Sequence, residues 1–137
     1  MNAIECIVYS ALQNEPLTPG RKITFPLEQR GDLTVEFGGH GPNLLPVVSV
    51  SFFDQEGLFP SLYEMRFEIT DLGWFPFYFR NDCEGFEGHV YGLDHSGKVT
   101  GVDHKMKQLF IRVFESWNQQ VIDYGIEQFV PASGGAV

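Results

Sequence analysis

The chain has 137 residues, of which 43% are hydrophobic and 15% aromatic, which is enough to bury a core without a metal or a disulfide. This composition excludes a disordered chain, because such chains have too little apolar surface to offset the entropy lost on folding. Eighteen carboxylates against nine Lys and Arg give a net charge of -9, which argues against a nucleic-acid partner. The same charge favours either a basic protein partner or plain solubility.

The N-terminal segment lacks the basic start and the long apolar run of an export signal, and no stretch is apolar enough for a membrane span. The two cysteines, Cys6 and Cys83, lie far apart in the sequence and form no C-x-x-C pattern. We therefore expect a cytoplasmic protein with two free thiols and no membrane contact.

Short runs of alternating, β-branched or aromatic residues predict strands along most of the chain. The predicted strands are Ile4–Ser10, Lys22–Leu27, Leu33–Phe37, Val47–Phe53, Met65–Thr70, Phe77–Arg80, His89–Leu93 and Lys98–Val102. Gly, Pro, Asn and Asp separate them, and short connections without helices imply mainly antiparallel pairing.

Three connections are predicted with particular features. His95-Ser96-Gly97 is the expected turn of a hairpin, because strand patterns flank a short polar stretch with glycine. Gly38–Asn43 is expected to be a mobile loop, since it lacks the spacing of a nucleotide-binding fingerprint. Residues Asp54–Tyr63 break the strand pattern and are expected to form a loop or one helical turn.

From Asp103 onward the spacing of apolar residues changes to that of one helical face. The face consists of Met106, Leu109, Phe110, Val113, Phe114, Trp117, Val121 and Tyr124. Asp103 is the expected N-cap and Gly125 the expected stop. The sequence therefore predicts one α+β domain over residues 1–130, with an antiparallel sheet of about six to eight strands packed by a long C-terminal helix. Residues 131–137 are expected to be a flexible tail.

Acidic residues are concentrated between Asp54 and Asp94, where nine carboxylates stand against Arg66 and Arg80 alone. Such a bias is typical either of solvated strand faces or of a surface that attracts a cationic partner. The residues expected to contact a partner are those in or beside predicted loops. They are Asp54, Glu56, Asp71, Trp74, Asp82, Glu84 and Glu87.

The run Trp74–Arg80 is almost continuously aromatic, which favours a strand buried on both faces. An alternative interpretation leaves Trp74 or Tyr78 exposed as an anchor for a partner.

Metal binding and catalysis have weaker support. Possible ligands between Asp82 and His104 lack the paired spacing of a zinc site or the order of a calcium loop, so no metal and no cofactor are predicted. His89, His95 and His104 are available for acid-base chemistry, yet neighbours along a strand point to opposite faces, and no nucleophile motif accompanies them.

The leading hypothesis is a non-catalytic acidic protein-binding module, an inhibitor or immunity-type protein that covers the basic active site of a partner such as a nuclease toxin. A second hypothesis is a small enzyme or ligand-binding domain with a pocket between sheet and helix that uses His89 or His95. A third is a structural subunit of an oligomer, held through exposed aromatic strands.

Overall fold

A computed structural model describes residues 1–13, 15–16, 18–27, 31–54 and 61–132. The chain begins with helix α1 (Ala3–Leu12) and ends with the long helix α2 (His104–Tyr124) and a single turn, η1 (Ile126–Gln128). Between the helices lie eight strands. They are β1 (Lys22–Leu27), β2 (Gly31–His40), β3 (Pro46–Asp54), β4 (Ser61–Thr70), β5 (Gly73–Asn81), β6 (Phe86–His89), β7 (Tyr91–Leu93) and β8 (Val99–Val102). The predicted α+β class with a long C-terminal helix is confirmed.

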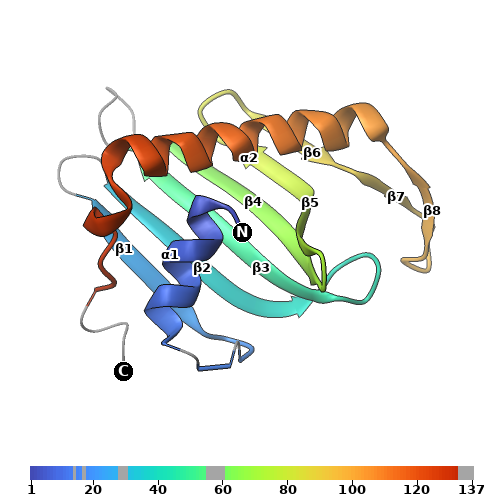
Figure 1. Cartoon of the computed structure of the whole chain (residues 1–137). Helices are drawn as coiled ribbons and strands as arrows, with labels where there is room; N and C mark the ends of the chain where they lie inside the picture. The colour runs from blue at the N-terminus through green and yellow to red at the C-terminus, as the bar shows by residue number, and fades with distance from the viewer. Residues whose placement is uncertain (14, 17, 28–30, 55–60, 133–137) are drawn as a thin grey trace.

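Strands β1 to β6 form one antiparallel sheet in which each strand pairs with its neighbours in sequence. Strands β7 and β8 form a separate hairpin beyond β6, at the end where α2 begins (Figure 1). The chain turns away from the sheet at Val90, which donates to the Phe77 carbonyl at 2.9 Å and accepts from the Asp103 N–H at 2.7 Å. The predicted strand His89–Leu93 is therefore divided. His89 ends β6, the buried Val90 lies between the strands, and Tyr91–Leu93 form β7.

Both helices lie on the same face of the six-stranded sheet (Figure 1). The core fills the space between these layers with side chains from one face of each strand, and rings dominate it. The ring centroids of Phe67 in β4 and Phe114 in α2 are 4.5 Å apart, and those of Phe79 in β5 and Phe110 in α2 are 5.7 Å apart. Burial of this aromatic layer is the main stabilising term, since hydrophobic stabilisation scales with the apolar area removed from water.

Helix α1 corrects the prediction of a strand over Ile4–Ser10. Asn2 caps the helix by accepting from the Glu5 N–H at 2.9 Å, and its amide nitrogen donates to the Glu5 carboxylate at 2.7 Å. The buried positions follow the three-and-four spacing of a helix, and they are Ala3, Ile4, Ile7, Val8 and Leu12. Asn118 of α2 joins the two helices, since its side-chain oxygen accepts from the Ile4 N–H at 2.8 Å.

Glu5 is the acidic side chain that the helix layer buries, with 9% of its surface exposed. Burial raises the pKa of this carboxyl. The positive charge of the N-terminal amino group and hydrogen bonds from the Asn2 side chain and the Trp74 backbone act in the opposite direction, because they favour the charged form. The raised pKa means that the native state holds this proton more tightly than the unfolded chain, so the contribution to stability decreases as the pH rises through the folded pKa.

The ends of α2 lie where the sequence predicts them. The Asp103 side chain accepts from the Met106 N–H at 3.0 Å. Gly125 has a positive φ of 109°, and its N–H donates to the Val121 carbonyl. Of the predicted tail, only Pro131 and Ala132 belong to the described residues, and Ala132 donates to the Thr24 carbonyl of β1 at 2.8 Å. Residues 133–137 lie outside the described residues.

Candidate functional site

The face of the sheet opposite the helices carries rows of polar side chains that cross from strand to strand. One row runs through Lys22, Glu36, Ser49, Arg66, Tyr78 and His89, in register across β1 to β6. The next row runs through Thr24, Thr34, Ser51, Glu64, Arg80 and Glu87. We call this surface the open sheet face. It exists because strand residues alternate between the two faces, and the inward ones fill the core.

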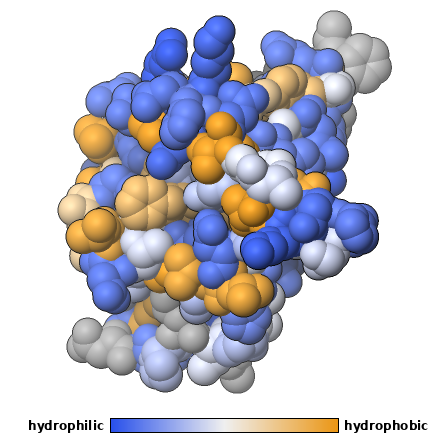
Figure 2. Space-filling model, turned by 90° about the vertical axis from the view of Figure 1, so that its right-hand side faces the viewer, coloured by the Kyte–Doolittle hydropathy of each residue, from blue (hydrophilic) through white to orange (hydrophobic). Residues whose placement is uncertain are grey.

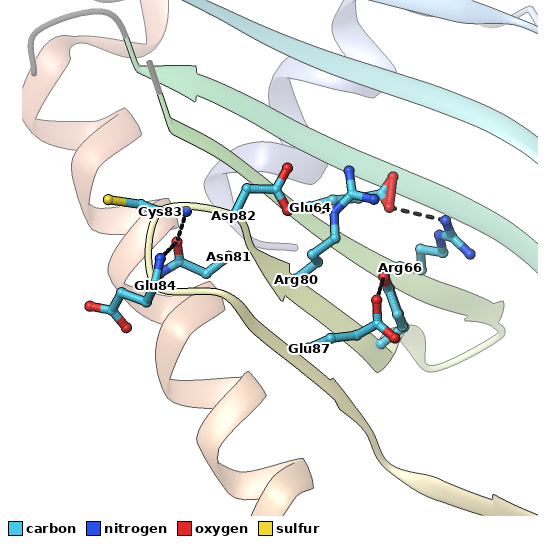
Figure 3. Close-up of polar contacts among 9 residues, drawn as sticks. Glu64, Arg66, Arg80, Asn81, Asp82, Cys83, Glu84 and Glu87 are labelled. Atoms are coloured by element: carbon cyan, nitrogen blue, oxygen red, sulfur yellow. Dashed lines mark hydrogen bonds and ion pairs between the residues drawn. The ribbon is translucent and has the colours of Figure 1, made fainter. Parts of the chain in front are cut away.

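Arg66 lies at the centre of the open sheet face. Its guanidinium carbon is 4.5 Å from the centre of the Tyr78 ring, and its Nη2 atom donates to the Glu64 carboxylate at 3.1 Å (Figure 3). A guanidinium over an aromatic face is attracted by the ring quadrupole, and the carboxylate offsets its charge. These contacts leave only 6% of Tyr78 exposed.

Tyr78 is also bound from the neighbouring strand β6. Its hydroxyl donates to the Glu87 carboxylate at 3.0 Å, and His89 Nε2 lies 3.7 Å from the other Glu87 oxygen. Burial, and then the hydrogen bond to Glu87, raise the pKa of the Tyr78 phenol. The phenol therefore remains a hydrogen-bond donor at neutral pH and holds Glu87 in place.

The turn between β5 and β6 presents further carboxylates at one end of the open sheet face. Asn81 shapes this turn, because its side-chain oxygen accepts from the Cys83 N–H at 3.1 Å and from the Glu84 N–H at 3.3 Å (Figure 3). Arg80 Nε lies 3.1 Å from an Asp82 oxygen, in an ion pair whose orientation does not make a hydrogen bond. Glu84 has no ion pair among the described residues.

Two hollows interrupt the open sheet face. The first has a volume of about 490 Å³ and lies over β2 to β4, where Glu36, Ser49, Ser51 and Glu64 line it. The second, of about 320 Å³, lies between the sheet and the β7–β8 hairpin, and Tyr78, His89, Tyr91 and Leu93 line it. His40, Arg66 and Phe77 line both, so the hollows form one continuous surface.

The connection between β2 and β3 forms a wall of this surface, and Glu68 holds it. The Glu68 carboxylate accepts from the Asn43 backbone N–H at 2.9 Å, from the Asn43 side chain at 2.7 Å and from the Leu45 N–H at 3.3 Å. A Cβ atom added to Gly41 would lie 2.4 Å from Glu68 Cγ, so the close approach requires glycine. The predicted mobile loop Gly38–Asn43 is therefore strand up to His40 and a tethered turn beyond it.

Figure 2 shows the molecule from the side on which the β7–β8 hairpin lies. Hydrophobic patches alternate there with hydrophilic side chains and do not merge into one apolar surface. Leu93 of the hairpin is 51% exposed beside the second hollow.

Four of the predicted contact residues lie at one end of the sheet. Asp54 ends β3, while Asp82, Glu84 and Glu87 belong to the β5–β6 turn and the strand after it. The antiparallel register places the end of β3, the start of β4 and the end of β5 at the same end of the sheet. Asp82, Glu84 and Glu87 are exposed there.

The other three predicted contacts do not join this group. Asp71 is exposed at the β4–β5 turn, at the opposite end of the nine-residue strand β5, so it lies roughly 25–30 Å from Asp82. Trp74 is 7% exposed and packs in the core, where its indole N–H donates to the Tyr9 hydroxyl at 3.2 Å. Glu56 lies outside the described residues.

The space between sheet and helix is nearly filled. A cavity of about 40 Å³ remains there, lined mainly by apolar side chains such as Leu33, Phe52, Trp117 and Phe129. A volume of that size holds about one water, and no histidine lines it. His89 instead lies on the open sheet face, so it is not the polar group of a pocket under α2.

The two Asp-His pairs are structural elements. Asp94 accepts from Ser96 and from the Lys98 N–H within the β7–β8 turn, and these hydrogen bonds lower the pKa of its carboxyl, the one from the Ser96 side chain most. His95 is exposed in that turn. Asp103 is the cap of α2, as described above, and His104 is the first residue of the helix.

Within the described ranges, no three His, Cys, Asp or Glu side chains gather in a way that could hold a metal ion. Cys6 and Cys83 are exposed free thiols. No described helix is both long and apolar enough to cross a membrane.

Comparison with protein families, with curated proteins and with solved structures finds no match to this chain.

Proposed function

We propose that this chain is an acidic protein-binding module of the inhibitor or immunity type, which covers a basic active site of a partner such as a nuclease toxin. The observation that supports this proposal best is the excess of carboxylates over cations on the open sheet face and the β5–β6 turn. Seven carboxylates against three cations lie on the open sheet face and its β5–β6 end. The carboxylates are Asp32, Glu36, Glu64, Glu68, Asp82, Glu84 and Glu87, and the cations are Lys22, Arg66 and Arg80.

Helix α2 alone has a small excess of cations. Helix α2 carries Lys105, Lys107 and Arg112 against Glu115 and Asp123. The acidic open sheet face attracts a cationic surface, because complementary charges accelerate the encounter of two proteins. The module inhibits by occupying the partner's active site, with no chemistry of its own.

The composition of the open sheet face also suits protein recognition. Arginine and tyrosine are enriched at the centres of interfaces, where they combine large contact area with hydrogen bonding. Arg66 is exposed and is held by the buried Tyr78 ring and by Glu64, so little side-chain entropy is lost when a partner contacts it.

Affinity capture with the tagged chain from its native cells tests the proposal, with mass spectrometry of the retained proteins. We expect one basic protein to be retained by the wild type and its recovery to fall at least about tenfold in Glu84→Lys with Glu87→Lys, because the reversed charges repel it. The fall should shrink as salt is added, since screening weakens both attraction and repulsion.

The matched control is Glu115→Lys with Asp123→Lys, which changes the net charge equally but lies on exposed positions of α2. This variant should retain the partner like the wild type. The proposal is contradicted if nothing specific is retained, or if both double variants lose the partner equally. Circular dichroism of each variant confirms that it is folded.

A further inference from the structure

The first hollow of the open sheet face is rich in hydrogen-bond acceptors. Its floor carries the short hydroxyl side chains of Thr34, Ser49 and Ser51. Glu36 of β2 and Glu64 of β4 stand on either side of that floor, because Ser49 pairs with Glu36 and Ser51 pairs with Glu64 across the strands. The carboxylates accept hydrogen bonds only, and the hydroxyls accept as well as donate.

We propose that this hollow is the subsite that seats an arginine side chain of the basic partner, an inference that rests on the function proposed above. An arginine carries five N–H donors in a planar fork, which matches two carboxylates flanked by hydroxyls. The volume of about 490 Å³ leaves room for a guanidinium and its aliphatic stem. Charge-assisted hydrogen bonds to the carboxylates supply both attraction and orientation.

Glu36 is the residue that makes the hollow receptive to a further cation. Glu64 already binds Arg66, whereas Glu36 is exposed and has no ion pair among the described residues. Lys22 is its register partner on β1, but the two side chains do not form an ion pair. The hollow therefore keeps one carboxylate, that of Glu36, that forms no ion pair among the described residues.

Arg66 shows how this face holds a guanidinium. The chain's own Arg66 lies over the Tyr78 ring. Its contact with the Glu64 carboxylate is drawn in Figure 3. An incoming arginine in the first hollow would lie between two carboxylates, with Glu36 on one side and the free acceptor sites of Glu64 on the other. The incoming guanidinium and that of Arg66 repel each other at close range, so binding in the first hollow needs both carboxylates, Glu36 and Glu64.

The test uses a synthetic peptide of alternating arginine and glycine, titrated into the isotope-labelled full chain and followed by amide NMR. We expect the amide signals of Thr34, Ser49 and Ser51 to shift most. In Glu36→Gln with Glu64→Gln the affinity for the peptide should fall about tenfold, while Glu115→Gln with Asp123→Asn on α2 should change it less than about twofold. A peptide with lysine in place of arginine should bind more weakly, because an ammonium group lacks the planar fork.

The possible outcomes separate this inference from the function on which it rests. If the shifts map to the β5–β6 turn and depend on Glu84 and Glu87, the arginine subsite is wrong and the acidic docking surface stands. If the neutralised pair on the sheet and the neutralised pair on α2 weaken binding equally, the affinity depends on net charge alone and the arginine subsite is also wrong. Glutamine is close to glutamate in shape, so a folded variant is expected, and its amide spectrum confirms it.

Discussion

Replacing Phe67 by alanine is expected to lower the free energy of unfolding by about 3–5 kcal/mol, the range for removing a fully buried aromatic ring. Phe67 has no exposed surface and lies in contact range of both Phe114 of α2 and Trp74 of β5, whose ring centroid is 5.8 Å away. The loss comprises the transfer free energy of the ring and the cavity it leaves between sheet and helix. Urea denaturation measures it.

Phe75→Ala is the matched comparison for this prediction. Phe75 is a phenylalanine of the same sheet, but it is 36% exposed and its ring faces Lys107 at 5.8 Å. Its removal should cost no more than about 1 kcal/mol. If Phe67→Ala does not fold, Phe67→Leu keeps most of the volume and is expected to cost less than about 3 kcal/mol. Equal losses for Phe67→Ala and Phe75→Ala would contradict the difference in burial between these two rings.

Glu68→Ala is expected to have the second largest effect, about 2–3 kcal/mol, because it removes three hydrogen bonds to a buried carboxylate. The Asn43 and Leu45 N–H groups lose their acceptor, and the connection that forms the wall of the open sheet face is released. Hydrogen exchange of these two amides should accelerate, and urea denaturation should give the loss of stability.

Glu36→Ala is the control for Glu68→Ala, since it removes an exposed glutamate from the same face and should change stability by less than about 0.5 kcal/mol. Glu68→Gln keeps one acceptor and should lie between the two. A Glu68→Ala variant as stable as Glu36→Ala, with unchanged exchange at Asn43, would mean that the carboxylate does not hold this connection.

The elements that carry strong local patterns are the ones that the sequence predicts well. Strand β1 has the predicted bounds, and α2 begins and ends at the predicted cap and stop, because apolar spacing and capping chemistry act over a few residues. Helix α1 was predicted wrongly from its β-branched residues. The Asn2-Ala3-Ile4-Glu5 stretch nevertheless has an asparagine N-cap followed by a glutamate in the first turn, and their side chains bond in the structure, so a local signal for the helix was present.

The aromatic run of β5 was harder to interpret because its alternation is interrupted. Arg66 pairs with Tyr78 whereas Phe67 pairs with Pro76, so the irregularity inserts Phe77 and changes which side chains face the core. Trp74 therefore packs under α1, while Tyr78 lies on the open sheet face. An interruption of this kind depends on the partner strand and leaves no local mark in the sequence.

The candidate site was predicted only in part for the same reason. The acidic turn at Asp82 and Glu84 is exposed as its composition suggests. Glu36, Ser49 and Glu64 come together only through the register of β2, β3 and β4, which sequence spacing does not specify. Glu68 resembled any other acid of the region, because its partners Asn43 and Leu45 lie more than twenty residues away in the sequence.

The most direct test of the central claim, that the open sheet face binds the partner, is hydroxyl-radical footprinting of the chain alone and in its captured complex. We predict that oxidation of Phe77, His89 and Tyr91 falls in the complex, while Leu109 and Ile122 on the exposed side of α2 react as in the free chain. Protection of Leu109 and Ile122, with unchanged oxidation of the open sheet face, would contradict the account.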